Sequence, residues 1–292
     1  MTLLDPLQIR RHFGQAAAGF DDVAVLAREA GKRLFESLDY LDDRQPEVIL
    51  EVGCGTGHNA ALLKKRWPRA RVIALDSALP MLRQAKAQAG WWKPFQRVAG
   101  DAAQLPLADA SVDLLVSNLC LPFVNDLADT LAGFRRVLKP DGLLLCSTYG
   151  SETLGELDYA FAQADTLPHV HPFAPIASFG DALMRAGFRD PVIDRDVFTL
   201  TYPDLPALMA ELRALGYANA RGDRRRTLTG RARFADATRA YEALRQADGR
   251  LPSSWEVLYA HAWAPAAGTP IRQQGQDIAA VPLSAIPIRR PG

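Results

Sequence analysis

Five short apolar segments alternate with segments of helical spacing along the first half of the chain. The apolar segments are residues 48–52, 71–75, 96–99, 112–118 and 143–148. Short runs that are apolar on both faces are typical of buried parallel strands, and the spacing between them is typical of amphipathic helices. This alternation predicts an α/β fold, in which helices cover both faces of a parallel sheet.

The flanking segments have weaker patterns. Residues 10–38 have helical spacing and predict a helix before the first strand. Further helices are predicted at residues 154–164, 179–186, 205–215 and 234–245, and two last strands at 192–202 and 255–263. We expect the helices beside a basic loop, 221–233, to form a small cap near the carboxyl end of the sheet.

Composition excludes several classes of protein. With 48% hydrophobic and 23% charged residues the chain has enough apolar side chains for a packed core. Its net charge of +1 gives no general attraction to nucleic acid or to an anionic membrane, and no segment has the roughly 20 apolar residues of a membrane span. The three cysteines have no C-x-x-C spacing, so neither a metal site nor a disulfide is expected. Residues 1–20 lack the features of a signal peptide, which favours a cytoplasmic protein.

A glycine-rich loop follows the first predicted strand, at the place where α/β sheets bind nucleotides. Its sequence is E-V-G-C-G-T-G, residues 51–57. Glycine lets the chain turn sharply and lets a ligand approach the backbone closely. A dinucleotide fingerprint has the spacing G-x-G-x-x-G, and an acid beside the loop repels pyrophosphate. Glu51 and the spacing of Gly53, Gly55 and Gly57 therefore favour a ligand with an ammonium group.

Two further acidic residues follow the next two predicted strands. Asp76 lies about 20 residues after the glycine loop, where an acidic side chain can bind both hydroxyls of a ribose. Asp101 can accept a hydrogen bond from the amino group of an adenine. NAD and S-adenosylmethionine (SAM) both fit Asp76, but acids at three successive strand ends favour a cationic adenosine ligand without phosphates.

This series of motifs resembles the class I SAM-dependent methyltransferases, whose sheet is Rossmann-like, over about residues 48–148. The resemblance implies that S-adenosyl-L-methionine is the cofactor. It places the loop glycines under the methionine part, Asp76 at the ribose and Asn118 near the sulfonium, with Asp101 and Ala102 at the adenine. The predicted cofactor-binding residues are Glu51, Gly53, Gly55, Gly57, Asp76, Ser77, Asp101, Ala102 and Asn118.

A closer resemblance extends over nearly the whole chain. The segments that carry it are residues 10–13, 16–21, 117–119, 136–140, 150–157, 168–169, 224–229 and 255–263. They resemble the malonyl-acyl-carrier-protein O-methyltransferases of biotin synthesis. The resemblance implies methylation of the free carboxylate of a malonyl thioester, so that fatty-acid synthesis can extend it towards pimelate. The thioester can be on acyl carrier protein (ACP) or on coenzyme A.

A carboxylate acceptor is already ionised at neutral pH, so methyl transfer to it needs positioning and desolvation more than a base. A donor that orients this carboxylate is expected, and too tight an ion pair would weaken the nucleophile. The candidate catalytic residues are His12, Asn118, Tyr149 and His169.

Malonyl-ACP is also the expected protein partner. ACP is acidic, and the densest basic stretch of the chain contains Arg221, Arg224, Arg225 and Arg226, followed by Arg231 and Arg233. Charge complementarity predicts that ACP docks there, although a solvated surface loop explains the same residues.

The chain departs from this family's pattern on the side where the acceptor is expected. Phe20, the pair Pro122-Phe123, and Pro172 stand where the pattern has a Tyr, a Gln-Trp pair and an Arg. A hydroxyl, an indole donor and a guanidinium are thus absent from the expected acceptor site. The differences leave the identity of the acceptor open.

Three alternatives follow. Residues 169–173 and 124–127 also resemble methyltransferase-like assembly factors of respiratory complex I, which implies hydroxylation of an arginine on a partner protein. A SAM-binding protein without catalytic activity is a second alternative. An NAD-dependent dehydrogenase is a third, which the glycine spacing and Glu51 disfavour.

We expect the chain to divide into four segments. These are an N-terminal helical lid (1–45), a SAM-binding Rossmann-like core (46–150), a helical cap with the last strands of the sheet (151–264) and an irregular C-terminal tail (265–292).

Overall fold

A seven-stranded sheet forms the centre of the computed structural model, which describes residues 3–41, 45–90, 94–225, 227, 230–268, 271–273 and 276–278. Its strands are β1 (Val48–Val52), β2 (Arg71–Asp76), β3 (Gln96–Ala99), β4 (Val112–Ser117), β5 (Leu138–Tyr149), β6 (Arg189–Tyr202) and β7 (Leu251–Trp263). Their order is β3-β2-β1-β4-β5-β7-β6. Strands β1 to β5 are parallel, which confirms the predicted α/β core, and β7 is antiparallel to both of its neighbours.

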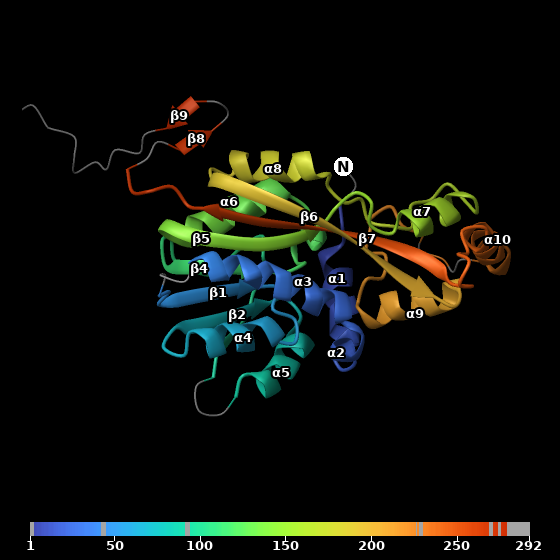
Figure 1. Ribbon diagram of the computed structural model, residues 1–292, viewed down its shortest axis with the longest axis horizontal. Helices are drawn as coiled ribbons and strands as arrows, with labels where there is room; N and C mark the ends of the chain where they lie inside the picture. Colours follow the sequence, from blue (N-terminus) through green and yellow to red (C-terminus); the bar gives the residue numbers. More distant parts are fainter. Residues whose placement is uncertain are drawn as a thin grey trace, which may run out of the picture.

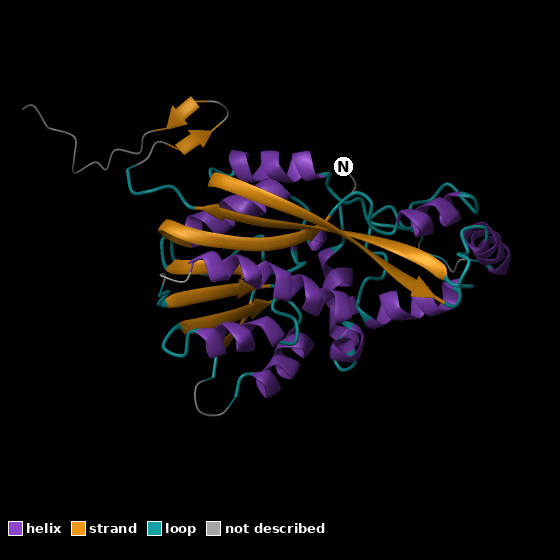
Figure 2. Cartoon of the chain, in the orientation of Figure 1, coloured by secondary structure: helices purple, strands orange, loops and turns teal. Residues whose placement is uncertain are grey.

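Helices pack on both faces of this sheet (Figures 1 and 2). They are α1 (Pro6–Ala16), α2 (Phe20–Val23), α3 (Val25–Glu36), α4 (His58–Arg66), α5 (Leu79–Gln88), α6 (Leu127–Val137), α7 (Gly155–Ala162), α8 (Ile176–Arg185), α9 (Leu205–Ala214) and α10 (Arg231–Glu242), with short 3-10 helices η1 (Ser37–Leu41) and η2 (Leu121–Phe123). Ile49 packs in one core cluster with α3 and α4, and Leu50 packs in the other with α6 and α8. Both faces of β1 are therefore buried, as its apolar sequence predicts.

The N-terminal segment forms three helices, and the prediction of one helix over residues 10–38 is wrong. The chain leaves α1 at Ala17, and Gly19 precedes α2 in a non-helical conformation. Ala16, Ala17, Ala78 and Met81 form a small buried cluster between the start of the chain and α5. Burial of this cluster stabilises the break between α1 and α2, and helical spacing alone does not reveal this break.

The cap lies where β6 and β7 extend beyond the other strands, with α7, α9 and α10 around their far ends (Figure 1). Buried Glu256 of β7 fixes the start of the cap, because its side chain accepts a hydrogen bond from the backbone N–H of Glu152 at 2.9 Å and one from Arg195 of β6. The predicted basic loop is shorter than 221–233, since α10 begins at Arg231.

Two segments differ from what their sequences suggest. Residues 139–142 have the turn-forming sequence K-P-D-G but lie within β5, where Asp141 has a φ of 58° and the pairing with β4 shifts register. The turn chemistry thus produces an irregularity inside a strand. In the tail, predicted to be irregular, β8 (Ile271–Gln273) and β9 (Gln276–Ile278) form an antiparallel pair, because local pairing satisfies their backbone hydrogen bonds.

Candidate functional site

The glycine loop forms one wall of a cavity at the carboxyl ends of the parallel strands. Gly53 and Gly55 line the cavity with φ values of 73° and 53°. A Cβ at Gly53 would lie 2.5 Å from the Cβ of Cys120, so only glycine fits there. Gly57 does not line the cavity: its φ is 84°, and a Cβ would lie 2.9 Å from the side chains of Ala85 and Phe95. The third glycine therefore permits close packing of α5.

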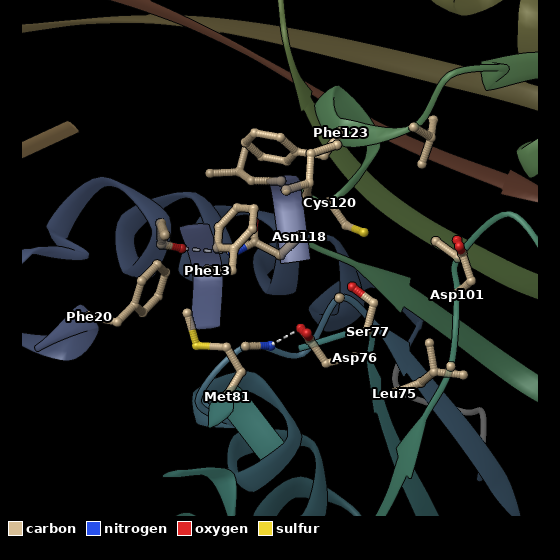
Figure 3. Close-up of a pocket in the computed structure, with 18 of the residues that line it drawn as sticks. Phe13, Phe20, Leu75, Asp76, Ser77, Met81, Asp101, Asn118, Cys120 and Phe123 are labelled. Atoms are coloured by element: carbon tan, nitrogen blue, oxygen red, sulfur yellow. Dashed lines mark hydrogen bonds between the residues drawn. The ribbon is translucent and has the colours of Figure 1, made fainter. Parts of the chain in front are cut away.

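Asp76 lies at the end of β2, within hydrogen-bond distance of the glycine loop (Figure 3). One carboxylate oxygen accepts a hydrogen bond from the N–H of Gly55 at 2.9 Å, and the other from the N–H of Ala78 at 2.8 Å. Burial raises the pKa of Asp76, and these two backbone hydrogen bonds oppose the rise. Ser77 lines the cavity beside it. The carboxylate thus shapes the glycine loop as well as the cavity.

Asp101 and Ala102 line the cavity from the segment after β3. Asp101 accepts a hydrogen bond from the N–H of Ala103 at 2.9 Å and remains exposed, so its carboxylate is accessible to a ligand. The structure therefore brings Asp76, Ser77, Asp101 and Ala102 to one cavity, as predicted from their places at strand ends.

Glu51 lies behind the glycine loop and does not line the cavity. Its side chain is 2% exposed, and its Oε2 has no hydrogen-bond partner among the described residues. Burial, followed by the nearby charge of Asp76, raises the pKa of Glu51 to about 8. The contact of Glu51 with a ligand ammonium, which the sequence suggested, stays a prediction.

The first two helices cover the cavity. Phe13 of α1 and Phe20 of α2 line it from the side opposite the sheet, together with Met81 of α5 (Figure 3). A hydrogen bond of 2.6 Å from the hydroxyl of Thr56 to Asp21 connects α2 directly to the glycine loop. The N-terminal segment thus lies over the cavity in the manner of a lid.

Asn118 follows β4 and lines the same cavity. Its Nδ2 donates to the carbonyl of Ala27 in α3, and its Oδ1 accepts from the hydroxyl of Ser147 in β5. The next residue, Leu119, has a φ of 54°, which a branched side chain rarely adopts. This strained turn aims the neighbouring Cys120 into the cavity, where burial raises the pKa of its thiol to about 12 and keeps it protonated.

A second cavity, which we call the cap cavity, adjoins the first. Its volume is about 380 Å³, against about 130 Å³ for the cavity over the glycine loop. Phe123 of η2 and Tyr217 line both, so these two aromatic residues mark the junction. Their ring centroids lie 5.2 Å apart. Tyr217 follows α9 with no sequence pattern to identify it, and sequence analysis missed it.

Tyr149, a predicted catalytic residue, lies beside this junction. Its hydroxyl is 3.0 Å from that of Tyr217. Burial raises the pKa of both phenols, to about 12 for Tyr217, so both stay protonated. A pair of neutral hydroxyls thus stands where the two cavities meet.

The cap cavity has a cationic lining. Three arginines line it, Arg213, Arg224 and Arg225, and no acidic residue does so among the described residues. Its other walls are largely apolar and aromatic. An elongated anionic ligand matches this combination of charge and apolar surface.

The predicted docking arginines are not a solvated patch. Arg221 makes two hydrogen bonds to Asp223, and Arg225 pairs with Asp165 at 2.9 Å. Arg224 donates to the carbonyl of Arg221 at 2.7 Å. These three side chains are 15–20% exposed. The alternative of a solvated surface loop does not fit these three side chains, because each guanidinium has partners within the fold. Docking of ACP at these arginines stays a prediction, and Arg226 lies outside the described residues.

Some of the remaining candidate residues line a cavity and others line neither. His169 lines the cap cavity, where its Nε2 lies 2.9 Å from Asp165 and its ring stacks on Phe161. His12 lines neither cavity, and burial lowers its pKa. Phe20 and Phe123 line the first cavity, whereas Pro122 and Pro172 line neither.

Two features are absent from the described residues. Within the ranges that the structure describes, no group of His, Cys, Asp and Glu side chains is arranged to hold a metal ion. In the same ranges no helix combines the length and the apolar character needed to cross a membrane.

Comparison with known proteins identifies the family. A model described as a methyltransferase domain matches residues 50–146. The chain is 56% identical over 288 residues to the malonyl-[acyl-carrier protein] O-methyltransferase of Xylella fastidiosa, covering 99% of this chain and 98% of that protein. The chain belongs to the malonyl-[acyl-carrier protein] O-methyltransferase family. The predicted membership is confirmed.

Solved structures agree with the fold of this methyltransferase. The YcgJ protein of Bacillus subtilis is 16% identical with a TM-score of 0.57, over 80% of this chain and 97% of that one. The phosphoethanolamine N-methyltransferase 2 of Haemonchus contortus, in complex with S-adenosyl-L-methionine, is 15% identical with a TM-score of 0.52, over 80% of this chain and 52% of that one. At these identities the likeness shows the Rossmann-like fold.

Proposed function

We propose that this methyltransferase transfers a methyl group from SAM to the free carboxylate of malonyl-ACP, in the pimeloyl stage of biotin synthesis. The observation that carries the proposal is the junction of two cavities at Phe123 and Tyr217. One cavity has the acids and glycines suited to an adenosine ligand, and the other has a cationic, largely apolar lining suited to an anionic thioester. Family membership supports both assignments.

The residues of the first cavity fit SAM. The missing Cβ of Gly55 leaves backbone accessible, the carboxylate of Asp76 can bind ribose hydroxyls, and exposed Asp101 can accept from an adenine amino group. When bound, SAM supplies a methyl group on a positively charged sulfur. Phe13 and Phe20 of the N-terminal helices cover the cavity, and exclusion of water by their rings would strengthen electrostatic interactions in the site.

The chemistry at the junction requires no base. The acceptor carboxylate is ionised at neutral pH. The thiol of Cys120 and the phenols of Tyr149 and Tyr217 remain protonated, so none of them competes as a nucleophile. The contribution of the protein is then positioning: aromatic walls desolvate the carboxylate and direct it towards the first cavity.

The decisive measurement is formation of S-adenosylhomocysteine by the purified chain with malonyl-ACP, with malonyl-coenzyme A and with no acceptor. Mass spectrometry of the thioester should show the gain of one methyl group on malonyl. SAM binding without turnover on either thioester would contradict the proposal and favour the non-catalytic alternative. Hydroxylated arginine on a partner, with SAM unchanged, would favour the complex I assembly factor alternative.

A further inference from the structure

His171 lies at the junction of the two cavities, and the sequence analysis did not identify it. It lines the cap cavity from the segment between α7 and α8. The centroid of its ring is 5.9 Å from that of Phe123, which lines both cavities. A ligand that extends from the cap cavity towards the glycine loop therefore passes this imidazole.

One hydrogen bond determines where the proton of this imidazole lies. The backbone N–H of Ala220 donates to Nε2 of His171 at 3.1 Å, so Nε2 must be unprotonated. In a neutral imidazole the proton then lies on Nδ1. Burial, with the nearby positive charges of Arg221 and His12, lowers the pKa of His171 to about 4, which keeps the ring neutral at physiological pH. Nδ1 has no hydrogen-bond partner in the described part of the chain, and the ring lines the cap cavity.

The other polar groups near the junction already have hydrogen-bond partners in the fold. The Nε2 of His169 pairs with Asp165. The hydroxyls of Tyr149 and Tyr217 share one hydrogen bond, and Asn118 donates to Ala27 and accepts from Ser147. His171 differs from them, because its Nδ1 has no hydrogen-bond partner within the described residues while its Nε2 accepts from Ala220.

We propose that the Nδ1–H of His171 binds the carboxylate of the acceptor and orients it for methyl transfer. This inference rests on the proposed function. A neutral donor holds a carboxylate oxygen without cancelling its charge, whereas a guanidinium in a close ion pair would weaken the nucleophile. The residue that follows, Pro172, stands where the family's pattern has an arginine and lines neither cavity, so position 172 supplies no cation beside His171.

Two substitutions distinguish the role of Nδ1 from the role of Nε2. His171→Asn keeps a donor near the Nδ1 position, and His171→Gln keeps an acceptor for the N–H of Ala220 but loses the Nδ1 donor. We expect His171→Gln to lower kcat/KM for malonyl-ACP by roughly ten- to a hundredfold, the usual cost of a lost hydrogen bond to a charged group, and His171→Asn to retain most of it. His261→Asn, on β7 and away from both cavities, is the matched control.

A ligand without the carboxylate distinguishes recognition from a structural role. Acetyl-ACP lacks the acceptor carboxylate, so its inhibition constant should be the same for the wild type and for His171→Gln, while malonyl-ACP binds more weakly to the variant. SAM affinity, measured by calorimetry, should also be unchanged. Equal loss for both thioesters, or wild-type kinetics in His171→Gln, would overturn the inference while malonyl turnover by the wild type upholds the proposed function. If the wild type does not methylate malonyl-ACP, both fail together.

Discussion

At the scale of single residues, Asp76 has two roles: its carboxylate lines the cavity, and it accepts a hydrogen bond from the glycine loop. Asp76→Asn replaces an oxygen that accepts from Gly55 or Ala78 with an N–H₂ donor, and it weakens the acceptor available to a ribose. We expect the Kd for SAM to rise roughly tenfold or more in titration calorimetry. Asp129→Asn, on the exposed first turn of α6, should leave the Kd unchanged. An unaltered Kd in Asp76→Asn would exclude Asp76 from the cofactor site.

Glu51 gives a prediction about pH. Its folded-state pKa of about 8 lies above its ordinary value of 4.5, so between these values the folded protein holds a proton that the unfolded chain has lost. The free energy of unfolding of the ligand-free protein should therefore fall as pH rises from 5 to 8, by on the order of 3 kcal/mol from this group. Glu51→Gln should remove most of that slope in urea titrations.

Glu47→Gln is the control for this experiment, because its side chain is 85% exposed. It should follow the wild-type pH dependence. If Glu51→Gln follows it too, Glu51 is ionised in the folded protein, and the sequence-based expectation of a charged acid beside the loop regains its support.

At the scale of elements, the lid helix α2 is attached to the glycine loop by the hydrogen bond between Thr56 and Asp21. Thr56→Val removes the hydroxyl and keeps the shape of the buried side chain. We expect the lid to open more often and SAM to dissociate several-fold faster in stopped-flow measurements, since about 1 kcal/mol is lost. Thr238→Val on α10, whose hydroxyl binds a carbonyl within its own helix, is the matched control. Identical dissociation rates in Thr56→Val and wild type would show that this contact does not restrain the lid.

At the scale of the whole molecule, the net charge of +1 offers no general attraction to an acidic partner, so docking of ACP depends on local charge. Arg213 of α9 is the candidate that the sequence analysis missed. It lines the cap cavity, is exposed, and has no carboxylate partner among the described residues, unlike Arg221 and Arg225. A free guanidinium is available to a partner, whereas a paired one must first break an existing contact.

Arg213→Gln should therefore raise the KM for malonyl-ACP by several-fold, and the increase should shrink as salt is added, because salt screens exposed charges. The KM for SAM should stay constant. Arg239→Gln, on an exposed site of α10, provides the comparison. A KM for malonyl-ACP that is the same in both variants would place the docking surface elsewhere.

The sheet and much of the cofactor cavity follow from patterns in the sequence. Apolar runs decide which segments become buried strands, and β1 and β3 have the predicted bounds. Because parallel strands end at the same edge, acids at strand ends such as Asp76 and Asp101 must come together, and they do. These features are local in sequence or follow from the alternation of strand and helix.

The tertiary structure alone decided the rest. Burial makes Glu51 a group that holds a proton behind the loop, and close packing with α5 requires the third glycine, Gly57. The junction depends on Phe123, His171 and Tyr217, which come from three connecting segments distant in sequence. No periodicity links such residues, since only the packing of the cap against the sheet brings them together. The acceptor site therefore depends on long-range packing, whereas the cofactor site follows from the order of strands.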